Sequence, residues 1–460
     1  MPTPQIMQRH PLNATMTDNF TPSFTDNPAL FVQWLRDVAP YVHTFRDKTF
    51  VIAFDGELVE QGHLEDLAYD VSLLRAMGMR IVLVHGARPQ IEKQLSLRGK
   101  TSEFLNGVRI TSSDALNAVK EASGALRLSI EAAFSQGLPN TPMSGANINV
   151  VSGNYITAKP IGVVNGVDFL HTGEVRKVAH DDIAKQLSMG NVVLLSPLGF
   201  SPTGEAFNLT NTEVAAEVAA ALKADKLIML SDQAVLGVDG DWVSEYDAAQ
   251  ARATADMLDL DHPLRPWLIA GCSAVERGVA RAHIIPSDLD GSLLLELFRH
   301  EGVGTMITKK LLENIRPATA NDLGGILQLI APLEQNGTLV PRGREKIEAE
   351  LPLFSVIEHD NYIFGCAALF PFNAEKMAEM ACFSIDQDAQ GTGLGNRILK
   401  HMEQRAKREG FERLFVLTTR AGHWFLKNGF TAGNVDDLPN DKKSMYNWQR
   451  KSQIFIKKIV

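Results

Sequence analysis

The sequence is poor in cysteine and has no cysteine pair at the spacing of a metal or redox motif. Its 460 residues include three cysteines, Cys272, Cys366 and Cys382, which lie in or beside apolar runs. Zinc sites and dithiol redox centres use paired thiols, usually in a C-x-x-C motif, so the sequence argues against both classes of site. The cysteines therefore predict a reduced, cytoplasmic chain, and no metal is expected.

Long apolar runs and a secretion signal are also missing. No uninterrupted apolar stretch approaches the roughly 18 residues that a membrane-spanning helix needs, so we expect no membrane span. Residues 1–27 are rich in Pro, Thr and Asn, and they lack the basic start and apolar core of a signal peptide. We expect 1–27 to be a disordered extension.

The chain has no excess of basic residues. It holds 45 Lys and Arg against 54 Asp and Glu, which gives a formal net charge of -9 at pH 7. Such a chain repels polyanions at long range, which argues against nucleic acid as a partner. Hydrophobic residues make up 45% and charged residues 22%, the composition of a globular protein. A chain of this length is expected to form two or more domains.

Apolar strand-like runs alternate with helical stretches over residues 28–308. Examples of the runs are 50–54, 80–85, 192–195 and 226–230. Continuously apolar strands are buried on both faces, which predicts an α/β domain with a mainly parallel sheet. A short linker is expected at 309–314, followed by a smaller α+β domain at 315–460.

A glycine loop in the smaller domain predicts an anion site. The apolar run 380–385 ends before Asp386, and the segment Q-G-T-G-L-G at 390–395 leads into a helical stretch at 396–408. The backbone N–H groups of such a loop, with the helix dipole behind it, can hold a pyrophosphate without a Lys or a metal. Taken alone, the motif is equally well explained by a strand-to-helix turn that needs glycine.

The segments after the loop favour the anion site. A second apolar strand at 413–419 precedes an aromatic stretch, H-W-F-L-K-N-G-F, at 423–430. This order of elements resembles the GNAT acyltransferase superfamily, whose glycine loop binds the pyrophosphate of acetyl-coenzyme A. The resemblance implies acetyl-CoA as co-substrate and no metal. It assigns the coenzyme to Cys382, Phe383, Ile385, Gln390, Gly391, Gly393, Leu394 and Gly395.

The larger domain carries a second resemblance. Segments 84–91, 151–155, 173–175 and 207–210 are similar to the N-acetylglutamate kinase branch of the amino-acid kinase family. This resemblance implies the α/β fold of those kinases for residues 28–308.

Departures from that family remove the kinase chemistry. Ala53 stands in place of the Lys that contacts the transferred phosphoryl group, and Thr212 stands in place of the catalytic Asp. Ala87 and Arg88 replace two glycines of the phosphate-binding loop, and Asp55 adds a carboxylate that would repel phosphates. Phosphoryl transfer depends on positioning and charge neutralisation, so we expect no kinase activity.

The two halves together resemble the bacterial N-acetylglutamate synthases, which begin arginine biosynthesis. The resemblance implies transfer of acetyl from acetyl-CoA to the α-amino group of L-glutamate, with L-arginine bound to the kinase-like domain as an inhibitor. It also implies a homo-oligomer, which is a hexamer in the family. Two other classes remain open. One is a non-catalytic arginine sensor with a CoA-binding module, and the other is a working amino-acid kinase, against which the missing Lys and Asp argue.

The same resemblance assigns catalytic roles. An ammonium group must lose a proton before it attacks a thioester, and Glu379 matches the family's general base. Thr418 falls where the synthases carry Ser or Thr and is assigned to protonate the departing thiolate. The backbone N–H near Cys382 would hold the oxyanion, while its thiol belongs to the core. The alternatives are a solvated strand-edge carboxylate at Glu379 and an ordinary β-branched strand residue at Thr418.

Substrate binding calls for cations, because L-glutamate brings two carboxylates and Arg offers forked hydrogen bonds. Arg342, Arg450 and Ser452 match the family's substrate-binding residues. The alternative for the basic tail is a solvated charged face.

Arginine binding is implied for the end of the larger domain. His283, Glu296 and Gly302 match the arginine-binding segment of arginine-sensitive kinases, which also carry an extra N-terminal helix that 28–45 could supply. The carboxylate of Glu296 would pair with the guanidinium. The alternative is a solvated helix residue at Glu296 beside a satisfied histidine at His283.

Overall fold

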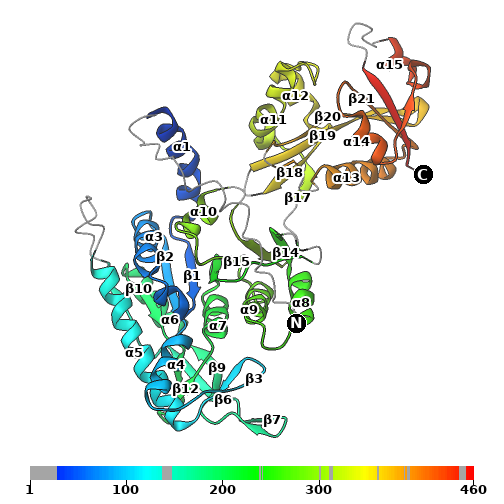
Figure 1. Cartoon of the computed structure of the whole chain (residues 1–460). Coiled ribbons are helices and arrows are strands. Elements are labelled where there is room, and N and C mark those ends of the chain that lie inside the picture. The colour runs from blue at the N-terminus through cyan, green and yellow to red at the C-terminus, as the bar shows by residue number, and fades with distance from the viewer. Residues whose placement is uncertain are drawn as a thin grey trace, which may run out of the picture. The chain divides into compact units, whose positions relative to one another are not determined.

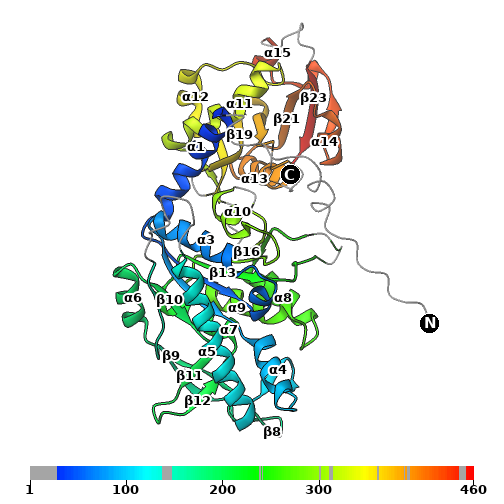
Figure 2. The same cartoon turned by 60° about the vertical axis from the view of Figure 1, so that its left-hand side comes forward.

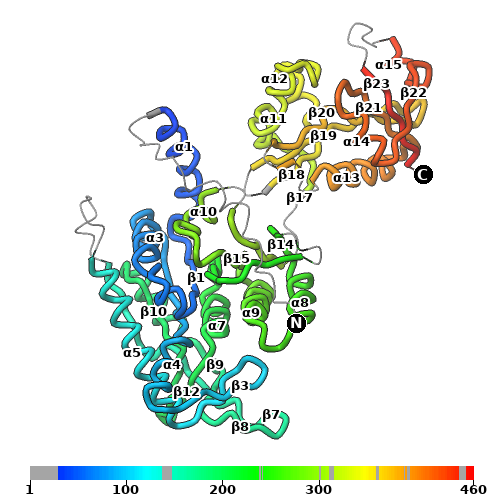
Figure 3. Tube along the Cα trace, viewed as in Figure 1, coloured from blue at the N-terminus to red at the C-terminus, as the bar shows by residue number. Residues whose placement is uncertain are grey.

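A computed structural model of the chain describes residues 28–136, 148–237, 240, 242–299, 302–309, 314–359, 362–387, 389–390, 394–444 and 452–459. The chain divides into two compact units, Met1–Leu311 and Leu312–Val460. Figure 3 traces the first unit from blue to green and the second from yellow to red. Within the described ranges, no helix is long and apolar enough to cross a membrane.

An eight-stranded sheet forms the centre of the first unit. Its strand order is β14-β16-β15-β13-β1-β2-β10-β5, and the paired strands run parallel except for β15 and β16. The mainly parallel sheet expected from the sequence is confirmed. The strands are β1 (Thr49–Phe54), β2 (Arg80–His85), β5 (Val150–Val151), β10 (Val192–Leu195), β13 (Lys226–Ser231), β14 (Glu245–Asp247), β15 (Arg281–Pro286) and β16 (Thr305–Thr308).

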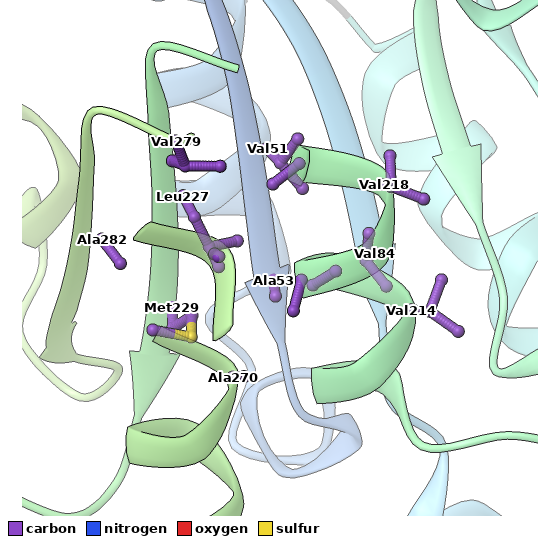
Figure 4. Close-up of a cluster of buried hydrophobic side chains, with 14 of the residues drawn as sticks. Val51, Ala53, Val84, Val214, Val218, Leu227, Met229, Ala270, Val279 and Ala282 are labelled. Carbon is purple, nitrogen blue, oxygen red and sulfur yellow. The ribbon is translucent and has the colours of Figure 1, made fainter. Parts of the chain in front are cut away.

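Helices cover both faces of this sheet (Figures 1 and 2). Successive residues of a strand point to opposite faces, so β1 gives Val51 and Ala53 to one core and Phe50, Ile52 and Phe54 to the other. Figure 4 shows part of the first core, with Val51 and Ala53 beside side chains from neighbouring strands and helices. That core is closed by α6 (His180–Ser188), α7 (Asn211–Leu222), α8 (Ala248–Met257) and α9 (Leu264–Glu276). The second core is closed by α3 (Leu64–Ala76), α4 (Arg88–Leu97), α5 (Ser113–Ser135) and α10 (Ser292–Phe298).

Smaller elements complete the first unit. Helix α1 (Pro28–Phe45) precedes β1, and the short helix α2 (Gly56–Glu60) follows it. A four-stranded sheet has the order β12-β11-β6-β9. Its strands are β6 (Ile156–Pro160), β9 (Gly173–Val178), β11 (Leu198–Phe200) and β12 (Ala206–Asn208). Two antiparallel pairs are formed by β3 (Glu103–Leu105) with β4 (Val108–Ile110), and by β7 (Val163–Val164) with β8 (Val167–Asp168).

The second unit is a seven-stranded sheet with helices on both faces. Its strand order is β17-β18-β19-β20-β21-β23-β22. The strands are β17 (Asn314–Pro317), β18 (Phe354–His359), β19 (Tyr362–Phe372), β20 (Met377–Ile385), β21 (Arg413–Thr418), β22 (Thr431–Gly433) and β23 (Gln453–Lys458). One face packs against α13 (Leu394–Arg408) and α14 (Gly422–Lys427), and the other against α11 (Leu323–Gln335) and α12 (Arg344–Glu350). The short helix α15 (Asn440–Ser444) precedes β23 in the chain.

Candidate active site

The sheet of the second unit forks at Glu379. Strands β20 and β21 pair in parallel from Met377 opposite Arg413 to Glu379 opposite Phe415. Beyond that point β20 continues to Ile385 and β21 to Thr418, and the pairing between them stops. Two parallel strands that part in this way leave backbone N–H and C=O groups that a ligand can bind. The fork is therefore a candidate binding position in the middle of the sheet.

One arm of the fork carries a β-bulge at Cys382. Cys366 of β19 opposes Ser384 and Ala368 opposes Ala381, so two residues of β20 face one residue of β19. Cys382 has φ of 50°, a left-handed conformation that is uncommon for a residue with a side chain. A bulge re-aims the backbone locally and is enriched next to active sites. Its position fits the oxyanion-binding role predicted for the backbone here.

The thiol of Cys382 is part of the core. The residue is 5% exposed and packs with side chains of α11 and β19. Burial raises the pKa of this thiol to about 11, so it is protonated near neutral pH. A protonated thiol is a poor nucleophile, which agrees with the expectation that the side chain does not react.

Glu379 is buried at the fork and has a charged partner. The residue is 6% exposed, and Nζ of Lys442 lies 2.6 Å from its Oε2. A solvated strand-edge carboxylate, the alternative considered for Glu379, is therefore wrong. Lys442 was missed from the sequence because it is one of several cations in the tail. Its pairing depends on where α15 packs, which no local pattern encodes.

The other arm of the fork ends at Thr418, opposite the start of β23. Thr418 ends β21 and stands opposite Gln453 of β23, so Ser452 is next to that register partner. The hydroxyl oxygen of Thr418 accepts hydrogen bonds from the N–H groups of Arg420 (3.3 Å) and Ala421 (3.1 Å). These bonds use the oxygen as acceptor, so the hydroxyl hydrogen can still be donated.

Arg342 is held near Glu379 through Phe370. The guanidinium lies 4.7 Å from the centre of the Phe370 ring, and Phe370 is the cross-strand partner of Glu379. Nη1 of Arg342 also donates to Oε2 of Glu350 at 2.8 Å. The arginine is therefore pre-oriented by an aromatic face and one carboxylate.

The described part of the glycine loop leads into α13 as expected. Gln390 Nε2 donates to the carbonyl of Ile385 at 3.2 Å, and Leu394 is the first residue of the helix. Gly391, Gly393 and Arg450, three of the predicted site residues, lie outside the described residues.

Aromatic side chains border the start of α13. The ring centres of Phe383 and Trp424 are 5.1 Å apart. A Cβ added to Gly395 would lie 3.3 Å from Trp424 and 4.0 Å from Phe383. Glycine at this position lets the helix backbone approach the rings closely. The aromatic pair therefore packs against the start of α13, among the residues that the resemblance assigns to the coenzyme.

In the first unit, the end of β1 is followed by the carboxylates of Asp55 and Glu57, and Ala53 stands in β1 where the kinases have a lysine. Oδ1 of Asp55 accepts a 2.8 Å hydrogen bond from Nδ2 of Asn211, the first residue of α7. Burial, reinforced by the neighbouring carboxylate of Glu57, raises the pKa of Asp55 to about 7. A Cβ on Gly86 would lie 2.9 Å from Asp55 Oδ1, so the glycine admits this carboxylate.

His283 and Glu296 form a buried pair on β15 and α10. His283 Nδ1 lies 2.6 Å from Glu296 Oε1, and its Nε2 lies 3.1 Å from Nζ of Lys226. Burial, with the adjacent Lys226, lowers the pKa of His283 to about 4, so the ring is neutral and accepts a hydrogen bond from the ammonium. A solvated Glu296, one alternative considered, is wrong because its side chain is 5% exposed.

Glu296 also fixes the loop before β16. Its Oε2 accepts from the N–H groups of Val303 (2.7 Å) and Gly304 (2.9 Å). Burial alone would raise the pKa of Glu296, but the hydrogen bonds from His283 and these two amides lower it to about 2. Gly302 has φ of 61°, and a Cβ there would lie 2.6 Å from Glu296 Oε2. Glycine is therefore required for both conformation and space. The three predicted residues His283, Glu296 and Gly302 are brought together.

Among the described residues, no group of three or more His, Cys, Asp or Glu side chains is arranged to hold a metal ion.

Fold and site define an acetyltransferase of the GNAT type joined to a unit of the amino-acid kinase type. The model of the acetyltransferase (GNAT) family matches residues 326–430, and that of the amino acid kinase family matches residues 48–285. An amino-acid acetyltransferase of Ralstonia nicotianae is 56% identical over 432 residues, which make up 93% of this chain and 95% of the relative. The amino-acid acetyltransferase of Escherichia coli K12 is 45% identical over 430 residues, covering 92% of this chain and 97% of the relative. The chain belongs to the amino-acid acetyltransferase family and is an acyltransferase.

Two solved structures are similar over almost the whole chain. Both are N-acetylglutamate synthase from Neisseria gonorrhoeae and are 36% identical in sequence. The one with coenzyme A and L-arginine has a TM-score of 0.81 and covers 93% of this chain and 99% of that one. The other, with coenzyme A and N-acetyl-glutamate, has a TM-score of 0.60 and covers 94% and 99%.

Proposed function

We propose that this protein transfers acetyl from acetyl-CoA to the α-amino group of L-glutamate, the first step of arginine biosynthesis, and that L-arginine inhibits it. The observation that carries the proposal is the fork at Glu379, which places a buried carboxylate between two diverging strands. The relatives add support, since a similar synthase binds coenzyme A, N-acetyl-glutamate and L-arginine. The test is thiol release from acetyl-CoA, measured with and without L-glutamate and then with added L-arginine.

Glu379 is the general base in this proposal. The ammonium of L-glutamate loses its proton to the carboxylate, and the amine attacks the thioester carbonyl. The backbone N–H at the bulge of Cys382 stabilises the oxyanion that forms. The hydroxyl of Thr418, on the opposite arm of the fork, gives a proton to the departing thiolate.

Acetyl-CoA binds along the fork and the start of α13. The N-terminus of this helix offers backbone N–H groups and the positive end of a dipole to the pyrophosphate. No metal is required for that contact. The residues assigned to the coenzyme are Cys382, Phe383, Ile385, Gln390, Gly391, Gly393, Leu394 and Gly395.

L-glutamate binds through its two carboxylates to Arg342, Arg450 and Ser452. Support comes from the position of Arg342 over the cross-strand partner of Glu379 and from the position of Ser452 beside the end of β21. An enzyme that released thiol at the same rate with and without glutamate would instead be a CoA-binding sensor.

L-arginine binds the first unit at His283, Glu296 and Gly302. Both oxygens of Glu296 already have protein partners, so the guanidinium has to share or displace the contacts to the loop at Val303 and Gly304. That exchange gives the ligand a way to change the conformation of this loop, as an allosteric effector must.

The first unit serves regulation without phosphorylating a substrate. We assign residues 28–308 to this regulatory domain, 309–314 to a linker and 315–460 to the acetyltransferase domain. The fully buried Ala53 and the buried Thr212 offer neither the lysine nor the carboxylate that phosphoryl transfer needs. A functional kinase, the other class left open by the sequence, is not supported.

The assembly is a homo-oligomer in the cytoplasm, a hexamer if it follows its family. Helix α1 supports self-association, because Val32, Trp34 and Leu35 are exposed by 42%, 52% and 52%. Large apolar side chains that gather on one helix mark an interaction surface. Sedimentation of the full chain tests the assembly, and Trp34→Glu should weaken it.

A further inference from the structure

Lys442 and Glu379 form a largely buried ion pair inside the second unit. The side chains are 19% and 7% exposed, and the charged atoms are 2.6 Å apart. Lys442 is carried by α15, whose first N–H, at Asn440, donates to Oε1 of Glu375 just ahead of β20. The helix is therefore bonded to the turn that precedes the strand carrying Glu379. This packing places the ammonium of Lys442 beside the carboxylate of Glu379.

While the pair is formed, Lys442 occupies Oε2 of Glu379. If Glu379 took up a proton while Lys442 stayed beside it, a buried ammonium would lose its counter-ion. A buried charge without a partner is costly, so Lys442 needs another anion before it can leave the carboxylate. An incoming anion would remove that obstacle by taking the lysine over.

The substrate supplies such an anion at the right place. In an α-amino acid the amine and the α-carboxylate share one carbon, so an amine next to Glu379 brings the α-carboxylate within reach of Lys442. Arg342, the nearby cation predicted for substrate binding, donates to Glu350 at 2.8 Å and is left for the other carboxylate of the substrate. Lys442 is thus a cation that can change partners at the point where the amine arrives.

We propose that Lys442 is a positioning residue that holds Glu379 in the empty site and moves to the α-carboxylate of the amino-acid substrate when it binds. This inference rests on the proposed function. It adds a group, Lys442, whose move to the substrate frees the carboxylate of Glu379 from its ion pair. The exchange makes the base available only when an α-amino acid occupies the site.

The experiment compares Lys442→Met, Lys442→Arg and Lys443→Met in the full chain. Lys443, the next residue of α15, serves as the matched control. Losing a charged hydrogen bond to the substrate raises KM for L-glutamate roughly ten- to a hundredfold in Lys442→Met, with partial rescue in Lys442→Arg. Lys443→Met keeps the wild-type constants.

A pair of substrate analogues separates this role from a structural one. L-glutamate α-amide lacks the α-carboxylate, and L-glutamine lacks only the side-chain carboxylate. In Lys442→Met, the ratio of kcat/KM for L-glutamate to kcat/KM for the α-amide falls by about the factor by which KM for L-glutamate rises. The corresponding ratio of L-glutamate to L-glutamine is unchanged. A general loosening of the fold would move both ratios.

Three outcomes are decisive. A KM for Lys442→Met within about twofold of Lys443→Met overturns the inference, as does a preference lost against L-glutamine instead of the α-amide. If Lys442→Met does not fold, calorimetry replaces the kinetics. It compares L-glutamate binding to the single variant Glu379→Gln and to the double variant Glu379→Gln with Lys442→Met. Equal affinities overturn the inference. Failure of the wild type to release thiol with L-glutamate would overturn the proposed function, a result distinct from all of these.

Discussion

Asn211 donates a hydrogen bond of 2.8 Å to Asp55 at the end of the first strand of the kinase-like unit. Asn211 also contacts the carbonyl of Phe54 at 3.3 Å, so the start of α7 is tied to the end of β1. The position predicted to repel phosphates thus takes part in an internal contact between two elements. Burial raises the pKa of Asp55 despite the hydrogen bond from Asn211, and this makes a measurable prediction about pH.

Asp55→Asn should stabilise the first unit at high pH. The pKa of Asp55 is raised by burial from 3.8 to about 7, so the native chain loses stability as pH rises from about 4 to about 7 and recovers none above it. A neutral Asn avoids that loss. We expect a higher thermal midpoint for Asp55→Asn at pH 8 and little difference near pH 4. The gain in the free energy of unfolding at pH 8 is at most about 4 kcal/mol, because the pKa rises from 3.8 to about 7.

The control for this comparison is Asp261→Asn on an exposed position of the same unit. Its midpoint should follow the wild type at both pH values. An Asp55→Asn chain that is equally stabilised at pH 4 and pH 8 would mean that ionisation of Asp55 is not the cause.

Glu379→Gln tests the general base. The amide keeps the size of the side chain but cannot accept the proton of the substrate ammonium, so kcat should fall by roughly 10²–10⁴. Glu412→Gln is a matched control, because Glu412 also pairs with a lysine, Lys376, at 2.7 Å but is half exposed. Steady-state thiol release measures both variants. Turnover of Glu379→Gln at the wild-type rate near neutral pH would move the base to another group.

The elements of the fold were largely predictable from local patterns. Apolar runs such as 50–54 and 226–230 became central strands because a parallel sheet buries both faces of such strands. Helix α13 was likewise predictable, since the sequence pattern over 396–408 is that of a helix. The order of elements also sufficed to identify the family.

The contacts inside the site were less predictable. No spacing in the sequence indicates that Lys442 meets Glu379, 63 residues away in the chain, because this contact depends on the packing of α15. The same is true of Glu296. Its assignment to a guanidinium treated the carboxylate as available, whereas the folded chain surrounds it with His283 and two backbone amides. Long-range packing, rather than residue type, decides which charges have partners.

Gly395→Ala should weaken acetyl-CoA binding. The new methyl group would lie 3.3 Å from Trp424, so the ring or the start of α13 has to shift at the proposed coenzyme site. We expect KM for acetyl-CoA to rise up to about tenfold, with KM for L-glutamate much less affected. Gly324→Ala is the matched control, since Gly324 is also the second residue of its helix and has open space around it. Equal acetyl-CoA constants in both variants would contradict the assignment.

Glu296→Ala should abolish inhibition by L-arginine. The substitution removes the carboxylate proposed to bind the guanidinium and also frees the N–H groups of Val303 and Gly304. The quantity to compare is therefore the ratio of thiol release with and without L-arginine, which is independent of any change in the basal rate. In the wild type this ratio should lie below one by a factor that corresponds to a coupling free energy of about 1–3 kcal/mol. Glu276→Ala, at the exposed end of α9, serves as the control and should keep the wild-type ratio.

Two further measurements decide where L-arginine acts. Calorimetry should detect L-arginine binding to the wild type and to Glu276→Ala, with a much weaker signal for Glu296→Ala. Inhibition should persist at saturating L-glutamate, because an effector bound to the first unit does not occupy the amino-acid site of the second. Inhibition that disappears at high L-glutamate and survives Glu296→Ala would place L-arginine in the acetyl-transfer site. The buried cluster of His283, Glu296 and Gly302 would then be a structural brace for the loop before β16.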